Sequence, residues 1–321
     1  MDKIDVIIPV YNPDDKLKKL LRGLYGQSVR ADRILLLWTI PEGKDGDLVE
    51  STEYTSCYGD EKSVDIVYIE KKDFDHGGTR AYGASLSDAG YLLFMTQDAV
   101  PDDDKLISSL IKMFDDENVA AAYARQLPAE DASIKEKISR EFNYPVTERV
   151  QNSDTLPCYG IKTYFCSDVC AMYKKICYDE AGGFVRRTIF NEDMIMAASL
   201  VKSGYTVMYT PQARVIHSHH YSYTEQFKRN FDLAVSQKEH PEVFDGVPSE
   251  GEGIRMVLTV AKKLIKAGKF YMLPDLFIES AFKYMGYRKG KRFDTLSEKE
   301  IMKYTMNRLY WINKWNTKKD N

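Results

Sequence analysis

Cysteine is scarce in this sequence, and the few cysteines present form no Cys-x-x-Cys pair. Five occur among 321 residues, at positions 57, 158, 166, 170 and 177. An odd number of cysteines without a secretory leader favours reduced thiols in the cytoplasm over a disulfide framework. A zinc site through Cys166 and Cys170 has only weak support, because no second pair of ligands stands at zinc spacing.

Long apolar runs are also absent. No segment approaches the ~20 uncharged residues that a transmembrane helix needs. The chain enters a strand-like run at Ile4 without the basic region, apolar stretch and cleavage site of a signal peptide. We therefore expect a cytoplasmic protein without a transmembrane helix. A length of 321 residues suffices for one large domain with an appendage, or for two domains.

Charge is distributed unevenly along the chain. The formal net charge is −3, but residues 251–321 hold 16 Lys/Arg and 7 Asp/Glu (+9), and residues 1–250 hold 29 and 41 (−12). This split, with an amphipathic stretch at 254–267, predicts contact with an anionic membrane surface, while a solvated basic face stays open as the alternative. Aromatic residues at 284, 310, 311 and 315 equally allow a homodimer interface. No nucleic-acid partner is expected.

Apolar periodicity predicts an α/β fold. Strands are expected at residues 4–9, 33–38, 64–69, 91–96 and 119–124, with helices at about 79–89 and 103–114 between them. Such alternation implies a mostly parallel sheet covered on both faces, with ligands at the carboxyl ends of the strands. Further along, the pattern predicts a helix at 192–203, short strands at 206–209 and 214–217, and helices from residue 254 onward that are separated at Pro274.

The first helix carries clear end signals. Asn12 can cap it, Pro13 suits its first turn, and Asp14 and Asp15 favour the positive end of the helix dipole. One apolar stripe then predicts its buried face: Leu17, Leu20, Leu21 and Leu24.

Two acidic segments suggest chemistry. Asp98 follows a buried-looking strand within Thr96-Gln97-Asp98, where a carboxylate can hold the Mg²⁺ or Mn²⁺ that stabilises a diphosphate leaving group. Asn191-Glu192-Asp193 opens a helix, where one carboxylate can act as general base toward an acceptor hydroxyl. The structural alternatives are that Asp98 caps the helix near residue 103, and that the acids at 192 and 193 only complement a helix dipole.

Two other segments supply nitrogen ligands and close backbone approach. His217-Ser218-His219-His220 gathers three of the five histidines, which favours a ligand or phosphate contact over isolated structural roles. Asp75-His76-Gly77-Gly78-Thr79-Arg80 stands between a strand and a helix; its glycines let a ligand approach the backbone, and Arg80 could contact phosphate. A simple helix-entry turn is the alternative for the second segment.

Together these segments resemble family 2 inverting glycosyltransferases of the GT-A fold, and most closely their bacterial rhamnosyltransferase-like branch. The resemblance covers nearly the whole chain. It rests on Val6-Ile7-Ile8-Pro9-Val10-Tyr11-Asn12, Phe74-Asp75-His76-Gly77-Gly78-Thr79-Arg80, Tyr91-Leu92-Leu93-Phe94-Met95-Thr96-Gln97-Asp98-Ala99, Gly182-Gly183-Phe184, Asn191-Glu192-Asp193, Gly204-Tyr205, Val215-Ile216-His217-Ser218-His219 and Lys283-Tyr284-Met285-Gly286-Tyr287-Arg288-Lys289-Gly290-Lys291.

The resemblance implies a role for each site residue. Asp98 and His217 would hold a divalent cation (Mg or Mn), and Asp193, beside Glu192, would be the catalytic base of a single in-line displacement that inverts the sugar. Donor binding is implied for Pro9, Tyr11, Asn12, Asp75, Gly77, Gly78, Arg80, Thr96 and Gln97. Acceptor or phosphate contacts are predicted for Ser167, Asp168, His219 and Arg229.

Two positions depart from the family pattern. Thr96 replaces the first acid of the Asp-x-Asp motif, as it does in the rhamnosyltransferase-like branch, so a single carboxylate is left there. The second strand ends in Leu37-Trp38-Thr39-Ile40, where the family often places an acid that contacts the nucleotide base or ribose. The mode of base recognition is therefore open.

The resemblance implies an enzyme that moves a sugar, with rhamnose expected, from a nucleotide-diphosphate donor to a saccharide acceptor, expected to be lipid-linked, in cell-surface polysaccharide synthesis. A GT-A domain at 1–245 and a helical region at 246–321 are expected, the latter docking on the inner face of the membrane or forming a dimer.

Another donor, such as a UDP-hexose, is the main alternative. A sugar nucleotidyltransferase fits less well, because its Gly-rich loop should follow the first strand, where Val10-Tyr11-Asn12-Pro13 stands. A non-catalytic scaffold on this fold would not need Asp98, Asp193 and His217 together.

Overall fold

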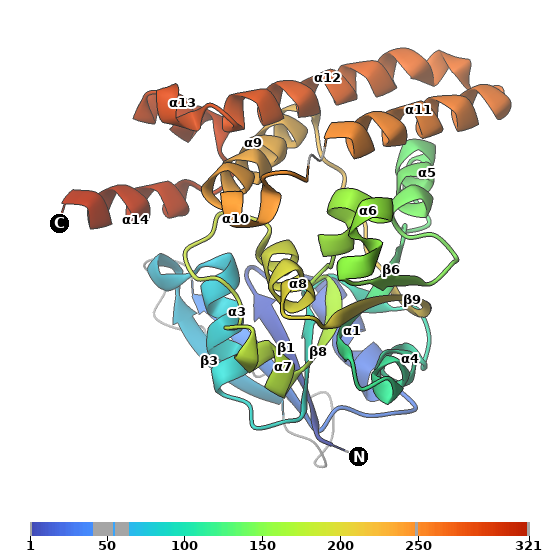
Figure 1. The fold of residues 1–321 in the computed structure, drawn as a ribbon, viewed down its shortest axis with the longest axis vertical. Helices are drawn as coiled ribbons and strands as arrows, with labels where there is room; N and C mark the ends of the chain where they lie inside the picture. The colour runs from blue at the N-terminus through green and yellow to red at the C-terminus, as the bar shows by residue number, and fades with distance from the viewer. Residues whose placement is uncertain (1, 41–53, 55–63, 248–249, 320–321) are drawn as a thin grey trace.

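A mixed sheet forms the centre of the protein (Figure 1). The computed structural model describes residues 2–40, 54, 64–247 and 250–319. Within these residues the sheet has nine strands, eight of them in the order β3-β2-β1-β4-β8-β6-β9-β5, and β7 pairs with β9. The bounds are β1 Ile4–Val10, β2 Arg33–Ile40, β3 Val64–Glu70, β4 Tyr91–Met95, β5 Val100–Pro101, β6 Val119–Leu127, β7 Arg149–Gln151, β8 Cys170–Lys174 and β9 Thr206–Ile216.

The first half of the sheet is parallel, as the sequence predicts. Strands β3, β2, β1 and β4 run parallel, β8 is antiparallel to both β4 and β6, and β9 runs parallel to β6. All five predicted strands are present. The two short strands expected at 206–209 and 214–217 are wrong as separate elements, because β9 runs through both and takes up three extra residues at a register shift opposite Ala124 and Arg125.

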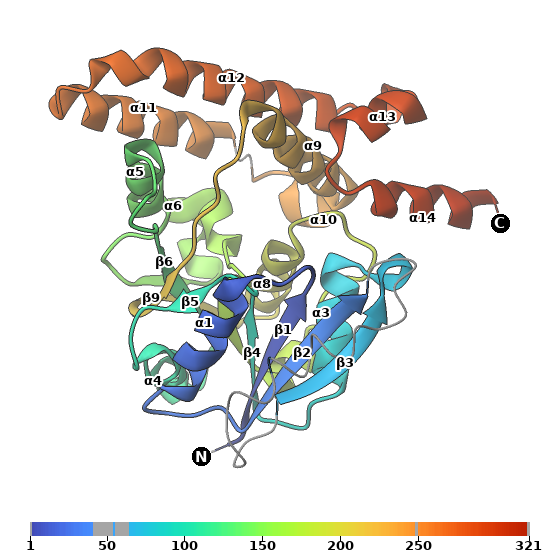
Figure 2. The ribbon, with the colours of Figure 1, turned by 180° about the vertical axis from the view of Figure 1, so that it is seen from behind.

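Helices cover both faces of the sheet (Figures 1 and 2). Ile7 points into one hydrophobic cluster and its neighbours Val6 and Ile8 into the other, as alternation along a strand requires. Helices α1 (Asp15–Tyr25) and α4 (Leu106–Ile111) cover the second cluster; α3 (His76–Ser85), α7 (Lys175–Glu180) and α8 (Glu192–Lys202) cover the first. The predicted leucine stripe of α1 is fully buried, and each such side chain contributes ~1.5–3 kcal/mol.

Two predicted helix starts are wrong. Helix α1 is capped by Asp14, whose side chain accepts from the Lys16 N–H, and Asn12 instead turns the chain with a φ of 45°. Helix α3 begins at His76, three residues early, because Asp75 caps the Gly77 N–H. These two shifts place the capping carboxylates next to the carboxyl ends of β1 and β3.

The helix predicted at 103–114 is a short α4 followed by the 3₁₀ turn η3 (Lys112–Asp115). Lys105 stands at its N-cap position, so Asp98 does not cap it. This removes the structural alternative for Asp98.

The C-terminal part is helical, as predicted. It contains α11 (Glu250–Lys266), the turn η6 (Phe270–Met272), α12 (Leu273–Gly290), the turn η7 (Phe293–Thr295), α13 (Glu298–Tyr304) and α14 (Arg308–Lys319), with Pro274 in the first turn of α12. Helix α12 packs along α9 (Tyr223–Glu239), which the sequence reading missed. Gly286 permits this close approach, since a Cβ there would lie 2.1 Å from the Phe227 carbonyl oxygen.

The connecting segments complete the fold. Between β6 and β8 the chain forms α5 (Ile134–Asn143), η4 (Ser153–Thr155), α6 (Leu156–Tyr159) and η5 (Gly160–Tyr164); η2 (Lys71–Asp73) and α10 (Pro241–Phe244) are single turns elsewhere. None of the described helices is both long and apolar enough to cross a bilayer. The described cysteines, Cys158, Cys166, Cys170 and Cys177, are free thiols; Cys57 lies outside the described residues.

Candidate active site

Asp98, His217 and His219 come together at one end of the sheet. Asp98 follows β4, and the two histidines follow β9. His217 Nε2 lies 3.5 Å from Asp98 Oδ1, and His219 Nε2 lies 3.8 Å from Asp98 Oδ2. These distances are too long for good hydrogen bonds but shorter than twice the ~2.1 Å of a metal–ligand bond, so one cation fits among the three side chains. Among the described residues this is the one cluster of its kind.

A buried hydrogen bond orients His217 for this role. Its Nδ1 lies 3.0 Å from Gln126 Oε1. An amide oxygen can only accept, so Nδ1 carries the proton and Nε2 presents its lone pair to Asp98. Burial, then the neighbouring His219 and Arg140, hold the pKa of His217 well below its ordinary value, which keeps the ring neutral as a metal ligand must be.

Gln126 is itself held in place. Its Nε2 donates to Tyr144 Oη at 2.6 Å and to Ser167 Oγ at 2.9 Å, and Arg140 donates to its Oε1. These contacts fix which end of the amide faces His217. None of Gln126, Arg140 and Tyr144 was predicted. The rule that selected Asp98, a polar residue near the end of a buried strand, would also have selected Gln126 in β6.

Replacing Gln126 tests whether its hydrogen bond with His217 contributes to metal binding. Gln126→Leu keeps the volume but removes the acceptor for His217 Nδ1, so we expect Mn²⁺ affinity to fall by roughly 10–100-fold. Isothermal titration with Mn²⁺ measures it. Gln212→Leu, at an exposed position of β9, is the matched control and should bind Mn²⁺ as the unmodified chain does. Equal Mn²⁺ affinity in the two variants would show that the hydrogen bond between His217 and Gln126 does not contribute to metal binding.

The donor set fits a divalent cation. One carboxylate and two imidazoles suit Mn²⁺ better than Mg²⁺, which prefers oxygen ligands throughout. Lys16 of α1, Arg140 of α5 and Arg229 of α9 all lie close enough to lower the pKa of both His217 and His219. The histidines and Asp98 therefore sit in a positively charged surrounding that suits a diphosphate. His220 lies apart, 3.4 Å from Asp131.

A second cluster holds the predicted base. Arg80 of α3 is almost fully buried; its Nη1 lies 3.0 Å from Glu192 Oε1, and its Nε lies 3.8 Å from Asp168 Oδ2. Tyr173 donates to Asp168 Oδ1 at 2.7 Å. Burial and the charge of Asp193 raise the pKa of Asp168 well above its ordinary value. Arg80 thus pairs with Glu192, and among the described residues Asp193 is left as the carboxylate of this cluster without a cationic partner at contact distance.

The surroundings of Asp193 suit a base. Burial and the Glu192 carboxylate raise the pKa of Asp193 to about 7, although the Met194 N–H, 2.7 Å from its Oδ1, acts in the opposite direction. A base works best when its pKa lies near the working pH, since it is then both deprotonated and strong enough to take a proton. Of the two acids, Asp193 is therefore the stronger candidate for a base.

This shifted pKa predicts the pH dependence of activity. Below pH 7 Asp193 holds a proton and cannot accept another, so log(kcat/KM) should rise with unit slope up to about pH 7 and level off above it. Initial rates of sugar transfer between pH 5.5 and 8.5, at fixed metal and ionic strength, measure this limb. A profile that is flat across pH 6–7.5 would contradict a base with this pKa.

Five of the predicted donor residues lie at the ends of β1 and β4: Pro9, Tyr11, Asn12, Thr96 and Gln97. The side-chain amide of Gln97 pairs with both backbone groups of Tyr11, at 2.8 and 3.0 Å, and so ties the two strand ends together. The Lys71 ammonium lies 5.8 Å from the centre of the half-exposed Tyr11 ring. Thr96 Oγ1 is buried and has no hydrogen-bond partner among the described residues. A bound ligand could supply that partner. Pro9 and Asn12 lie on either side of Tyr11 in the sequence.

The Asp75–Arg80 segment does not point its arginine at solvent. Arg80 is engaged by Glu192, and its Nη1 also donates to the His76 carbonyl at 3.0 Å. Gly77 is required by close approach, because a Cβ would lie 1.9 Å from the Val185 carbonyl oxygen. The carboxylate of Asp75 lies 3.1 Å from where a Cβ on Gly78 would be, and accepts from the Arg187 N–H. The segment therefore locks α3 against the loop that leads to Glu192.

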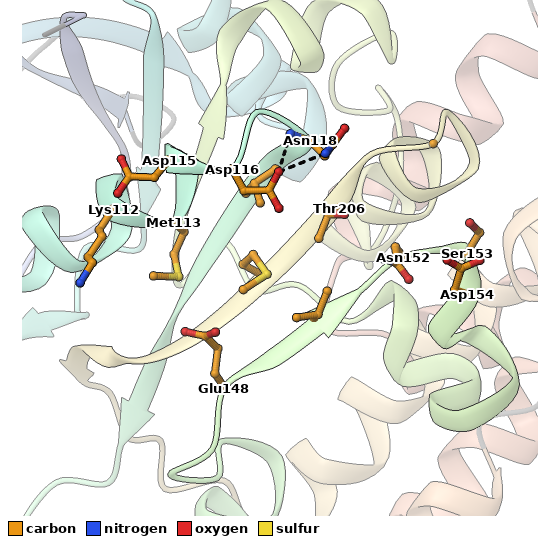
Figure 3. Close-up of a pocket in the computed structure, with 14 residues that line it drawn as sticks. Lys112, Met113, Asp115, Asp116, Asn118, Glu148, Asn152, Ser153, Asp154 and Thr206 are labelled. Atoms are coloured by element: carbon orange, nitrogen blue, oxygen red, sulfur yellow. Dashed lines mark hydrogen bonds between the residues drawn. The ribbon is translucent and has the colours of Figure 1, made fainter.

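A separate cavity lies away from these residues. It encloses about 550 Å³ beside β7, β9 and η3 (Figure 3). Its lining includes four carboxylates against a single lysine: Asp115, Asp116, Glu148 and Asp154, with Lys112. An acidic lining repels a diphosphate, and none of the predicted site residues belongs to it. This cavity is therefore a poor candidate for binding a diphosphate donor.

Comparison with known proteins agrees with this geometry. Residues 5–182 match the family described as glycosyl transferase family 2. The chain is 34% identical over 315 residues to the O-antigen chain rhamnosyltransferase RfbN of Salmonella typhimurium, covering 97% of this chain and 96% of RfbN. It is 33% identical over 318 residues to the O-antigen chain rhamnosyltransferase WbaN of Salmonella anatum, covering 98% and 97%.

Solved structures share the fold at low sequence identity. The mannosyltransferase PcManGT of Pyrobaculum calidifontis, solved with GDP-mannose and Mn²⁺, superposes with a TM-score of 0.63 at 13% identity, covering 92% of this chain and 88% of that one. TarS residues 1–349 of S. aureus, solved with UDP, superposes with a TM-score of 0.53 at 12% identity, covering 91% of each. The fold and site thus define a glycosyltransferase of GT-A architecture. The chain belongs to glycosyl transferase family 2.

Proposed function

We propose that this protein transfers rhamnose from a nucleotide-diphosphate donor to a hydroxyl of a saccharide acceptor during synthesis of a cell-surface polysaccharide. The main support is near full-length similarity to two O-antigen chain rhamnosyltransferases. The clusters around Asp98 and Asp193 supply the chemistry that such a transfer needs. Each cluster is built from segments that are distant in the sequence, which a non-catalytic scaffold would not require.

The proposed mechanism uses the two clusters separately. Asp193 removes the proton from the acceptor hydroxyl, while Arg80 holds Glu192 and fixes the start of α8. A divalent cation held by Asp98, His217 and His219 would neutralise charge on the departing diphosphate. Arg229 and Lys16 add positive charge on that side. Attack from the face opposite the leaving group inverts the anomeric carbon.

A donor panel tests the proposed sugar. The purified chain is incubated with dTDP-rhamnose, GDP-mannose, UDP-glucose or UDP-N-acetylglucosamine, with Mn²⁺ or Mg²⁺ and with a mixture of mono-, di- and trisaccharides as acceptors, and release of the nucleoside diphosphate is followed. We expect dTDP-rhamnose to be turned over fastest and Mn²⁺ to support more activity than Mg²⁺. Preference for a UDP-hexose would overturn the rhamnose assignment but leave the glycosyltransferase intact.

We further propose that the acceptor is lipid-linked and that the protein works in the cytoplasm on the inner face of the membrane. The 246–321 region would act as a docking module added to the transferase domain at 1–245. Helices α11 and α12 lie side by side across the top of the molecule, with α5 and α9 beneath them (Figures 1 and 2). Large apolar side chains are exposed on them and at their joining turn: Ile254, Leu258, Ile265, Phe270, Tyr271, Phe277, Ile278, Tyr284 and Met285.

Charge favours an anionic bilayer as the occupant of this surface. Exposed apolar residues at 254, 258 and 265 share one side of α11, opposite the buried Val260 and Leu264. Lys262 and Lys266 are exposed between them, and each lysine near an anionic surface contributes ~1 kcal/mol. A soluble homodimer through the same helices is the competing use.

Liposome binding distinguishes the two uses. Phe270→Ser with Tyr271→Ser removes the aromatic residues at the turn between α11 and α12, so we expect binding to vesicles of 30% phosphatidylglycerol to fall by about tenfold or more. Co-sedimentation measures it. Ile176→Ser, at an exposed isoleucine of α7, is the matched control. If light scattering shows a dimer and the protein does not bind anionic vesicles, the helices would instead be assigned to self-association.

A further inference from the structure

A cavity of about 780 Å³ lies between three segments that are distant in the sequence. Its walls come from η2 and the start of α3, from the loop before α8, and from α14; Figure 1 shows α14 above the start of α3. The volume falls within the ~300–1,000 Å³ typical of small-molecule pockets. Neither Asp98, His217 nor His219 lines it. The cavity is therefore separate from the proposed metal site.

The cavity adjoins the side of the site that holds the base. Asp75 and His76 form part of its wall. The His76 carbonyl accepts from Arg80 Nη1 at 3.0 Å, and the same nitrogen lies 3.0 Å from Glu192 Oε1. Arg187, which also lines the cavity, donates its backbone N–H to Asp75. One layer of side chains thus separates the cavity from the start of α8.

The lining suits a polar but uncharged ligand. Both of its lysines are ion-paired, since Lys72 lies 2.7 Å from Glu70 and Lys314 pairs with Glu239. The charge of the third cationic side chain, Arg187, is offset by the two carboxylates of the lining, Asp73 and Asp75. The rest of the lining is rich in amide groups and aromatic rings: Asn307, Asn313, Asn316, Phe74 and Tyr310. Amides donate and accept hydrogen bonds to sugar hydroxyls, and rings pack on the apolar face of a sugar. A diphosphate would instead require unpaired cations.

In an in-line displacement, the acceptor hydroxyl and the leaving diphosphate lie on opposite sides of the anomeric carbon. The leaving diphosphate lies toward Asp98, and the nucleoside beyond it lies toward Tyr11 and Lys71, neither of which lines the cavity. The acceptor hydroxyl must arrive from the opposite side, where Asp193 and Glu192 stand. We propose that the cavity binds the saccharide of the acceptor beyond its reacting hydroxyl, with α14 as one wall. This inference rests on the proposed function.

Filling the cavity tests this assignment. Asn316 of α14 is exposed in the lining, and Asn316→Trp places an indole there. Arg308→Trp adds the same bulk at an exposed position of α14 outside the lining and is the matched control. Labelled full-length protein is applied to an array of mono-, di- and trisaccharides, and dTDP binding is measured by titration calorimetry. Circular dichroism checks folding, and Asn316→Ala provides a milder variant.

We expect the unmodified chain to retain di- or trisaccharides, and Asn316→Trp to weaken this retention by about tenfold or more through lost hydrogen bonds and space. Arg308→Trp should retain them, Asn316→Ala should weaken retention in the same direction by less, and dTDP affinity should not change in any variant. Retention unaffected by Asn316→Trp, or no saccharide retained by the unmodified chain, would overturn the assignment. Loss of dTDP binding instead would assign the cavity to the donor nucleoside. Failure of the proposed function is seen separately, as no turnover of any sugar nucleotide in the donor panel.

Discussion

Asp193→Ala should lower the rate of sugar transfer by ~10²–10⁴-fold, the usual contribution of a general base. The variant removes the one carboxylate in its cluster that is not neutralised by Arg80, whereas Glu192 is held at 3.0 Å from that arginine. Donor affinity should stay within about twofold, because the donor diphosphate lies on the Asp98 side of the site. Transfer rates at saturating donor, with donor affinity from calorimetry, measure the two effects separately.

Two controls make this result specific. Asp154→Ala removes an exposed carboxylate beside the acidic cavity and should leave transfer unchanged. Glu192→Gln keeps the shape of the neighbouring side chain but removes its charge, so the pKa of Asp193 should fall and the rising limb of the pH profile should move to lower pH. Transfer by Asp193→Ala at the unmodified rate would eliminate this residue as the base.

Asp98→Ala should abolish metal-dependent transfer. Asp98 is the common member of the two contacts that define the metal cluster, at 3.5 Å from His217 and 3.8 Å from His219. Without it two neutral imidazoles remain, which cannot offset the charge of a divalent cation. We expect the transfer rate to fall by ~10³-fold or more. A bound metal lowers the free energy of the transition state by several kcal/mol, because it stabilises the charge that develops on the leaving group. Electron paramagnetic resonance of added Mn²⁺ measures binding directly.

A graded series strengthens this test. His219→Ala removes the more exposed of the two histidines and should weaken Mn²⁺ binding less than Asp98→Ala does. Asp131→Ala removes the exposed acid beside His220, outside the cluster, and should have no effect. Tight Mn²⁺ binding by Asp98→Ala would show that the cation is held elsewhere.

The five strands, and the approach of Asp98 to His217, could be predicted from sequence because each signal is local. A buried strand followed by a polar residue predicts a ligand at a sheet edge, and this rule correctly brings Asp98 and His217 together. Helix ends were less predictable. Asn12 and Asp14 are both good caps, and only the left-handed turn at Asn12 decides that Asp14 caps α1.

The contacts that support the site could not be predicted, because they join segments distant in the chain. Gln126 meets His217 across 91 positions and Ser167 across 41, and no local pattern encodes either contact. The contacts of Arg80 are a further example. Its sequence context suggests a phosphate contact, and nothing in that context predicts its burial against Glu192 and Asp168.

The central claim, an inverting rhamnosyl transfer by Asp193, is tested most directly by one product analysis. The chain is incubated with Mn²⁺, dTDP-rhamnose and a saccharide that it retains on the glycan array, and the new linkage is examined by nuclear magnetic resonance. We expect a rhamnosylated product whose anomeric configuration is opposite to that of the donor, and no product with Asp193→Ala. A product with retained configuration, or one formed equally well by Asp193→Ala, would contradict it.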